Sequence, residues 1–262
     1  MSSGPSVTKQ LVEKCGVWRK PETGDNIQRV VGGVPVRHGT LPWQASIRIR
    51  GYGNRTYHNC GAVIISPYHV LTTAHCMYQH RDQLDIYYVR VGDNIIEVHD
   101  EEEMEFDIEK VDFHEDFGVG PRLNNDIAVV HIDRSKHSAG ILFGDKVLAV
   151  CLPQVTTDYS SRTNVTISGW GSLGKEDGNF RSGVNSVSKL QMATLPIIDT
   201  EVCRRPEVYG DNKISSGMFC AGLLSGGLDS CQGDSGGPAI NYQILPNANE
   251  VRATLMGLVS WG

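Results

Sequence analysis

Short runs that alternate hydrophobic with polar residues recur along the chain, separated by clusters of turn-forming residues. The first run, for example, alternates around Ile47 and Ile49. A period of two residues is typical of β-strands that bury one face. The pattern predicts one set of strands in each half of the chain, at 46–50, 62–65, 87–91 and 127–132, and at 165–168, 190–192, 218–221 and 255–259.

Long helical patterns do not alternate with these runs, and only residues 199–205 are predicted to form a helix, a short capped one. A parallel α/β sheet needs a helix between successive strands and is therefore disfavoured. The 29 glycines and 11 prolines favour a turn-rich β protein. Paired antiparallel barrels and a β-sandwich both fit this pattern.

Composition and net charge limit the classes of molecule that the protein is expected to bind. Of the 262 residues, 40% are hydrophobic and 21% charged, as expected for a globular chain. The formal net charge of −6 argues against nucleic acids and anionic membranes as partners. No apolar run approaches the roughly 18 residues that a membrane span requires. Because the first residues lack the apolar core of a secretory signal, we expect the chain to derive from a longer precursor.

One segment, residues 229–238, carries candidate nucleophilic chemistry. It places Ser235 in a glycine-rich turn, where backbone amides can converge on a reacting oxygen. A serine hydroxyl needs a positioned base, and that base needs a group that fixes its tautomer. His75, beside a cysteine, and Asp126, ahead of an apolar run, are candidates for these two roles.

Together these segments resemble the trypsin-like branch of the chymotrypsin family of serine proteases, in which His, Asp and Ser follow one another in this order. Residues 88–93 and the acidic stretch after them look similar to the protease domains of arthropod and neurotrypsin-like mosaic proteins. The family resemblance runs from Arg29 to the last residue and rests on Arg29-Val30-Val31-Gly32-Gly33, Pro42-Trp43-Gln44, Ala74-His75-Cys76, Asp126-Ile127-Ala128, Cys151-Leu152-Pro153, Gly169-Trp170-Gly171, Gly233-Asp234-Ser235-Gly236-Gly237 and Ser260-Trp261-Gly262.

The resemblance implies a role for each matched residue. Ser235 would be the acyl-forming nucleophile, His75 its general base and then acid, and Asp126 the group that orients the imidazole. The backbone amides of Gly233 and Ser235 would form the oxyanion hole. Asp229 would lie at the base of the specificity pocket, where a buried carboxylate favours arginine or lysine. The residues expected beside the substrate are Ser260, Trp261 and Gly262.

The resemblance also implies an activation step and a domain organisation. A trypsin-like protease would cut after Arg29, and the new α-amine of Val30 would pair with Asp234. Residues 1–29 would be the activation segment or linker, 30–150 an N-terminal barrel with His75 and Asp126, and 151–262 a C-terminal barrel with Asp229 and Ser235. We expect an all-β fold of two antiparallel barrels, the second incomplete because its last strand and C-terminal helix are missing.

The family pattern further implies three disulfides. They pair Cys15 with Cys151, Cys60 with Cys76, and Cys203 with Cys220, and Cys231 remains unpaired because its partner would lie beyond Gly262. Such bonds indicate an oxidising compartment, so we expect a secreted protein. The sequons at Asn54-Arg55-Thr56 and Asn164-Val165-Thr166 match the glycosylation pattern and predict a glycoprotein.

Several alternatives remain open. No CxxC or HExxH spacing supports a metal-dependent hydrolase, so we expect no catalytic metal and no cofactor. The acidic run 100–103 is most simply a solvated loop, and the alternative is a calcium loop between Asp93 and Glu103, to which Ile95 would add at most a carbonyl. The expected partners are substrates with Arg or Lys at the scissile position, an activating protease and protein inhibitors. The rival function is a catalytically disabled, protease-like binding domain.

Overall fold

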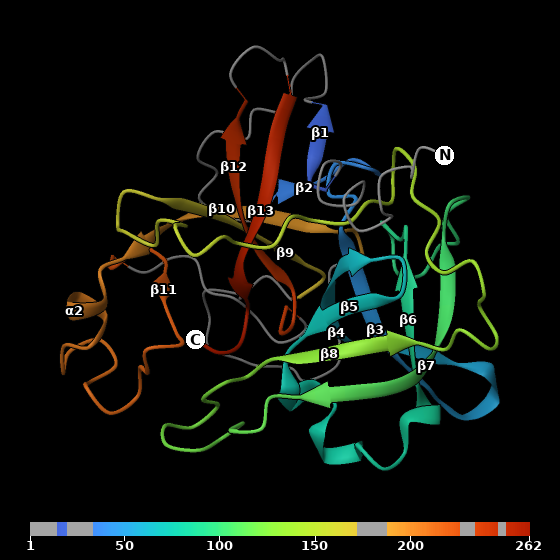
Figure 1. Cartoon of the computed structure of the whole chain (residues 1–262), viewed down its shortest axis with the longest axis horizontal. Helices are drawn as coiled ribbons and strands as arrows, with labels where there is room; N and C mark the ends of the chain where they lie inside the picture. Colours follow the sequence, from blue (N-terminus) through green and yellow to red (C-terminus); the bar gives the residue numbers. More distant parts are fainter. Residues whose placement is uncertain (1–14, 20–33, 172–187, 226–233, 246–249) are drawn as a thin grey trace, which may run out of the picture.

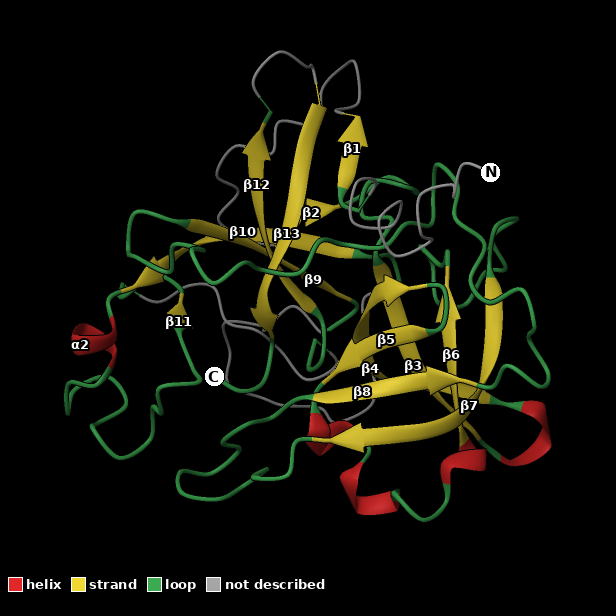
Figure 2. Ribbon diagram, viewed as in Figure 1, coloured by secondary structure: helices red, strands yellow, loops and turns green. Residues whose placement is uncertain are grey.

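The computed structural model describes residues 15–19, 34–171, 188–225, 234–245 and 250–262. Within these ranges the chain forms two β units that lie side by side (Figure 1). Strands dominate both units, and the helical segments are single turns at their periphery (Figure 2). The mostly β architecture confirms the expected fold class.

The first unit is a closed barrel of antiparallel strands in the order β3-β4-β5-β8-β7-β6. Along β8, the side chains of Ala128, Val130 and Ile132 are buried, and the two residues between them are half-buried. This alternation places one face of each strand in a common apolar core. The strands are β3 (Gln44–Arg50), β4 (Thr56–Ser66), β5 (His69–Thr72), β6 (Tyr87–Val91), β7 (Met104–Phe113) and β8 (Ala128–Ile132).

The second unit is an open sheet rather than a second closed barrel. Among the described residues its strands follow the order β1-β13-β12-β9-β10-β11, and β2 pairs with β10. The expected barrel is therefore confirmed for the first unit, and over the described residues the second unit is an open sheet. Its strands are β1 (Val17–Arg19), β2 (Val34–Pro35), β9 (Asn164–Gly169), β10 (Gln191–Ile198), β11 (Cys220–Ala221), β12 (Pro238–Ile244) and β13 (Glu250–Leu258).

The helical segments are short. The helix predicted at 199–205 is a single turn, α2 (Thr200–Cys203), which begins where the Asp199 carboxylate accepts a hydrogen bond from the amide of Glu201. No helix in the described part of the chain is both long and apolar enough to cross a membrane. The 3₁₀ turns are η1 (Tyr52–Asn54), η2 (Ala74–Cys76), η3 (Tyr78–His80) and η4 (Leu84–Ile86).

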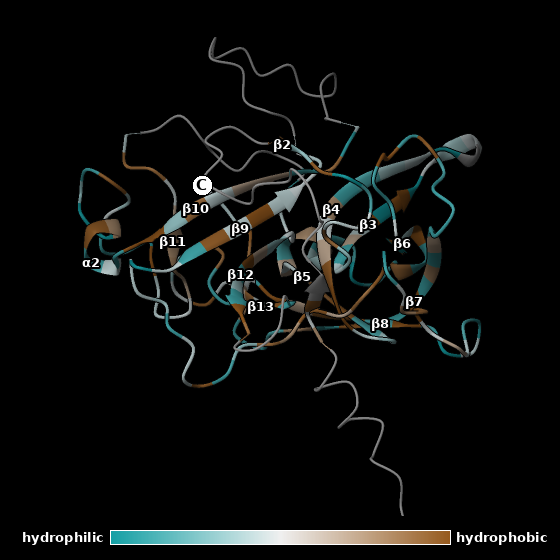
Figure 3. Ribbon diagram, turned by 90° about the horizontal axis from the view of Figure 1, so that it is seen from above, coloured by the Kyte–Doolittle hydropathy of each residue, from teal (hydrophilic) through white to brown (hydrophobic). Residues whose placement is uncertain are grey.

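Strand β7 shows why the sequence pattern missed some strands. Its register against β8 shifts between Ile108 and Lys110, a β-bulge that moves the buried positions by one residue. The shift breaks the period of two that would have indicated a strand. In β9 and β10 no such shift occurs, and hydrophobic and polar residues interchange along these strands (Figure 3).

An apolar layer joins the two units. Trp43 of the first unit and Trp170 of the second are fully buried in one cluster, which also contains Val63 and Ile240. Buried polar groups meet across the same boundary, where the Ser168 hydroxyl donates to the Gln44 side-chain oxygen at 2.7 Å. The units are thus packed firmly enough for loops from each to form one site.

The structure contains the three disulfides that the resemblance implies, Cys15–Cys151, Cys60–Cys76 and Cys203–Cys220. The first of them anchors β1 to the second unit. Beside it, the Gly16 amide donates to the Ala149 carbonyl, and the Ala253 amide donates to the Gly16 carbonyl, both at 2.8 Å. Cys231 lies outside the described residues.

Candidate active site

His75 and Asp126 meet because of the strand register of the first barrel. Thr72, the last residue of β5, pairs with Ala128, the first residue of β8. His75 follows three residues after Thr72, and Asp126 comes two residues before Ala128. The His75 ring Nδ1 lies 2.7 Å from Asp126 Oδ2, and the His75 amide donates to Asp126 Oδ1 at 2.9 Å. One carboxylate therefore orients both the ring and the backbone of the histidine.

A third donor reaches the same carboxylate. The Ser260 hydroxyl, just beyond β13, donates to Asp126 Oδ2. The Asp126 side chain is only 3% exposed, so these protein donors replace water around it. A carboxylate held in this way favours the tautomer with hydrogen on His75 Nδ1, which leaves Nε2 able to accept a proton. Sequence reasoning placed Ser260 beside the substrate and missed this contact with Asp126.

The turn that carries Ser235 is anchored on the first barrel. The amide of Gly61, in β4, donates to the Ser235 carbonyl at 2.8 Å. Within the turn, the Gly237 amide donates to the Asp234 carbonyl at 2.8 Å. The Gly236 amide donates, also at 2.8 Å, to the carbonyl of Val259, the residue that follows β13 in the second unit. The backbone at Ser235 is thus held from both units. Gly233, the other residue of the expected oxyanion hole, lies outside the described residues.

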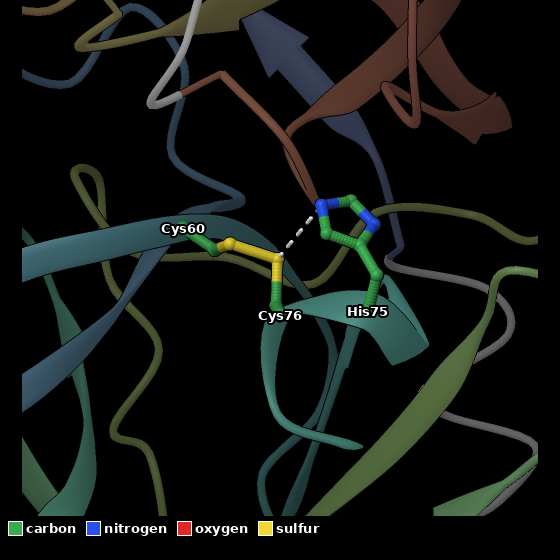
Figure 4. A group of neighbouring side chains, drawn as sticks. All are labelled: Cys60, His75 and Cys76. Atoms are coloured by element: carbon green, nitrogen blue, oxygen red, sulfur yellow. Dashed lines mark hydrogen bonds between the residues drawn. A yellow bond between two sulfur atoms is a disulfide. The ribbon is translucent and has the colours of Figure 1, made fainter. Parts of the chain in front are cut away.

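The base and the nucleophile are neighbours, but they are not hydrogen-bonded to each other. His75 Nε2 is directed at the Cys60–Cys76 disulfide, 3.9 Å from Cys76 Sγ (Figure 4). The Ser235 carbonyl oxygen lies 3.9 Å from the same sulfur. Within the described ranges no hydrogen bond joins the Ser235 hydroxyl to His75. Of the predicted arrangement of three residues, the hydrogen-bonded pair of His75 and Asp126 is therefore present. The turn that carries Ser235 lies beside this pair.

The Asp234 carboxylate is directed into the second unit. Its Oδ1 accepts a hydrogen bond from the Gly171 amide at 2.9 Å. A Cβ atom on Gly171 would lie 2.4 Å from the Asp234 Cγ, and one on Gly169 would lie 2.2 Å from its Oδ1. Only glycines leave room for the carboxylate there. The other residues of the expected activation and specificity sites, Arg29, Val30 and Asp229, lie outside the described residues.

The expected substrate-side residues lie next to this site. Ser260 and Trp261 are half-buried, and Gly262 is exposed. The indole of Trp261 packs edge-on against the ring of Tyr209, with ring centroids 5.0 Å apart and an angle of 77° between the ring planes. This contact orients the indole. Sequence reasoning did not select Tyr209, because a single aromatic residue in a turn carries no pattern.

A catalytic metal site does not fit the groups around His75. In the described part of the chain, the one cluster of metal-ligating side chains consists of Cys60, His75 and Cys76, whose ligand atoms lie within 4.8 Å of one another. Both sulfurs belong to a disulfide. Because the thiolate is the form of cysteine that ligates metals, this pair offers no ligand while the bond is intact.

A calcium ion also fits poorly between Asp93 and Glu103, because Arg90 lies there. The Arg90 Nη1 is 3.4 Å from Asp93 Oδ2, and its Nε is 3.1 Å from Glu103 Oε1. The guanidinium thus pairs with both carboxylates that would bind the ion. Burial, followed by the charge of Glu103, raises the pKa of Asp93 to about 6, against the opposing effects of Arg90 and Arg48. We derive no role for a metal at this loop.

Comparison with known proteins agrees with this geometry. A family model described as Trypsin matches residues 30–262. Transmembrane protease serine 11G of Rattus norvegicus is 35% identical over 238 residues, which are 90% of this chain and 50% of that protein. Transmembrane protease serine 11A of Homo sapiens is 34% identical over 237 residues, again 90% of this chain and 50% of the relative. Transmembrane protease serine 11C of Mus musculus is 33% identical over 234 residues, 89% of this chain and 48% of the relative.

The chain spans about half the length of the curated relatives that it matches. The family model nevertheless covers the whole stretch from residue 30 to residue 262, which includes the first barrel, every strand of the second unit except β1, and the segments that carry His75, Asp126 and Ser235. This chain belongs to the trypsin family of serine proteases.

Proposed function

We propose that the chain is a serine endopeptidase that works through an acyl-enzyme. The observation that carries the proposal is the hydrogen bond between His75 Nδ1 and Asp126 Oδ2, next to the turn that holds Ser235. In this mechanism Ser235 Oγ attacks the scissile carbonyl, and His75 Nε2 takes its proton and later gives it to the leaving amine. Asp126 stabilises the imidazolium that forms in between.

This chemistry requires His75 Nε2 and the Ser235 hydroxyl to come within hydrogen-bond reach while Nδ1 keeps its hydrogen bond to Asp126. The Asp126 carboxylate also accepts from the backbone amide of His75, so the histidine stays anchored during this movement. Ser235 and Gly233 would supply the amides that bind the tetrahedral oxyanion, worth roughly 3 to 4 kcal/mol per donor.

We further propose that the chain cleaves after arginine or lysine. The basis is Asp229, six residues before the nucleophile, whose carboxylate would be unpaired against an apolar substrate side chain. An arginyl or lysyl peptide amide should be cleaved, and the phenylalanyl analogue barely. A preference for phenylalanine would contradict the assignment. The Asp229→Ser variant should lose the basic preference and retain reactivity toward a small phosphonate.

Activation would follow cleavage after Arg29 by a trypsin-like protease. The new amine of Val30 would then compete for the Asp234 carboxylate, which in the uncut chain accepts from the Gly171 amide. The three disulfides support an oxidising, extracytoplasmic setting, and we extend the proposal to protein inhibitors as partners. The finer likeness to mosaic proteins of arthropods stays a prediction.

The test is removal of the nucleophile in the chain after cleavage at Arg29. Ser235→Ala should lower kcat by about 10⁶-fold, because the acyl-enzyme cannot form. Ser138→Ala is the matched control, since this serine is exposed and, in the described structure, only its carbonyl takes part in a hydrogen bond. Turnover of Ser235→Ala above a thousandth of wild type would refute the proposal.

The rival is a binding domain that retains the fold without catalysis. It is favoured by one observation, the orientation of His75 Nε2 toward the disulfide rather than toward Ser235. Labelling with an arginyl organophosphonate after cleavage at Arg29 separates the two functions. A stoichiometric adduct on Ser235 supports the enzyme, and its absence supports the binding domain.

A further inference from the structure

Three segments of the candidate site converge on one buried residue, Thr72. It ends β5, the strand that leads to His75, and it pairs with Ala128, two residues after Asp126. Its side chain is fully buried. Sequence reasoning assigned this threonine no role, and the mechanism proposed above does not use it.

The hydroxyl of Thr72 connects these strands to the nucleophile. Thr72 Oγ1 donates to the carbonyl of Gly61 at 2.8 Å. The amide of the same glycine donates to the carbonyl of Ser235, also at 2.8 Å. A two-step hydrogen-bonded path therefore runs from the strand that carries the base to the residue that carries the nucleophile.

The packing around this path leaves no room for adjustment. Gly236 has φ +80°, and a Cβ atom there would lie 2.3 Å from both Thr72 Oγ1 and the Gly61 carbonyl oxygen. A Cβ atom on Gly61 would lie 2.7 Å from the Cα and the amide nitrogen of Gly237. The backbones of β4 and the serine turn thus touch directly, and the Thr72 hydroxyl is wedged against them.

We propose that Thr72 is a positioning residue for the reaction, whose hydroxyl sets the position of Ser235 relative to His75 through the backbone of Gly61. The inference rests on the proposed function. A hydroxyl suits this place because it is compact and directional. A methyl group would leave the buried Gly61 carbonyl without this donor and would press on Gly236.

Two substitutions separate this role from ordinary packing. Thr72→Val retains the shape of the side chain and removes the hydroxyl, whereas Thr72→Ser retains the hydroxyl and removes the methyl group. In the 262-residue chain after cleavage at Arg29, Thr72→Val should lower kcat for an arginyl peptide amide by roughly 30-fold, because small displacements of reacting groups cost rate steeply. Its KM should change by less than about twofold, since uniform binding is untouched.

Thr72→Ser should keep kcat within about threefold of wild type even though it loses a buried methyl group and some stability. Urea unfolding of both variants provides the stability ranking. A purely structural threonine would make kcat follow stability in both variants. Thr72→Val with wild-type kcat, or Thr72→Ser losing more than tenfold, would overturn the proposal, and the serine variant decides alone if the valine variant fails to fold.

Hydrogen exchange at the Gly61 amide gives a readout that does not depend on turnover. It should be about tenfold faster in Thr72→Val than in wild type, because the peptide that follows Gly61 loses the Thr72 donor and the Gly61 backbone beside the bonded amide is then less firmly held. If activated wild type cleaves nothing, the proposed function fails, and the exchange rate still decides whether Thr72 holds the turn. Unchanged protection of Gly61 in a folded valine variant would contradict the inference.

Discussion

The closed first barrel and the open second sheet contribute to the candidate site in different ways. The barrel brings His75 and Asp126 into contact through its own register, since β5 and β8 are neighbours around the ring. The second sheet presents Ser235 from a turn just before β12, and that turn is anchored on Gly61 of the barrel. The barrel thus brings its two residues together through its own strands, with one added donor from the second unit, Ser260, whereas the nucleophile turn of the sheet takes one of its backbone anchors from the barrel.

This difference shows where geometry is robust and where it is adjustable. Six strands in a closed ring fix each pair from two sides, so the contact between the histidine and the carboxylate follows from the topology. The serine turn is packed tightly against the barrel at Gly61, so the contacts left to change on activation are those on its other side, where Asp234 bonds the Gly171 amide of the second unit. Activation and substrate binding are therefore expected to act on the sheet side.

Among changes to the barrel, the largest expected effect comes from breaking the contact between His75 and Asp126. Asp126→Asn should lower kcat about 10⁴-fold, because an amide no longer fixes the tautomer with hydrogen on His75 Nδ1. The measurement is kcat at pH 8 after cleavage at Arg29. Asp116→Asn, an exposed carboxylate in the preceding loop, is the control. Near-normal kcat in Asp126→Asn would mean that the barrel register does not organise catalysis.

Removing one disulfide from each unit allows the two units to be compared, because the two bonds close loops of nearly equal length. Cys60–Cys76 spans 16 residues and Cys203–Cys220 spans 17, so loop entropy predicts a loss of about 3 kcal/mol in the free energy of unfolding for each double alanine variant. Only the first pair lies beside His75, so only its removal should also reduce kcat. Urea unfolding and kinetics measure the two effects. Loss of kcat in the second variant alone would reverse the comparison.

A smaller effect concerns the buried Asp93 at the rim of the barrel. Burial raises its pKa to about 6, so the folded state binds the proton more tightly than the unfolded state does. The stability contribution is full below about pH 4 and is lost as pH rises through about 6. Asp93→Asn should therefore raise the free energy of unfolding by about 3 kcal/mol at pH 8 and by only about 1 kcal/mol at pH 4.5.

Asp112 is the matched control for this pH dependence. It is exposed, and a hydrogen bond from Lys110 lowers its pKa, so its contribution has the opposite sign and is lost as pH falls. Urea unfolding of Asp93→Asn and Asp112→Asn at pH 8 and at pH 4.5 measures the two contributions. A gain for Asp93→Asn that is larger at pH 4.5 than at pH 8 would contradict the assigned cause.

The smallest expected effect is that of calcium. Because Arg90 pairs with Asp93 and Glu103, the melting temperature should agree within about 1 °C in calcium and in EDTA. Arg90→Gln should lower the melting temperature and restore part of the loss in calcium, since two carboxylates then lose their cation. A rise of more than about 3 °C in wild type with calcium would show that the ion binds beside the arginine.

Much of the fold and of the site could be predicted from local pattern. Eight strand segments and the capped turn at Thr200–Cys203 were expected, because alternation and capping are local signals. Strands β1, β2, β5, β7 and β12 were missed. The first three have two to four residues, β7 contains a bulge, and β12 begins with a proline beside the serine turn. Each of these weakens the local period without preventing strand pairing.

The sequence by itself determined the residue types of the site, their order and the disulfide partners, because short motifs and their resemblance to a family carry that information. Only the tertiary structure decided that Ser260 donates to Asp126, that Thr72 reaches Ser235 through Gly61, and that Arg90 pairs with the acidic loop. Apart from the pair of Arg90 and Asp93, which are three residues apart, these contacts join residues from different segments of the chain. Their distances follow from barrel closure and from the packing of two units, which no local pattern encodes.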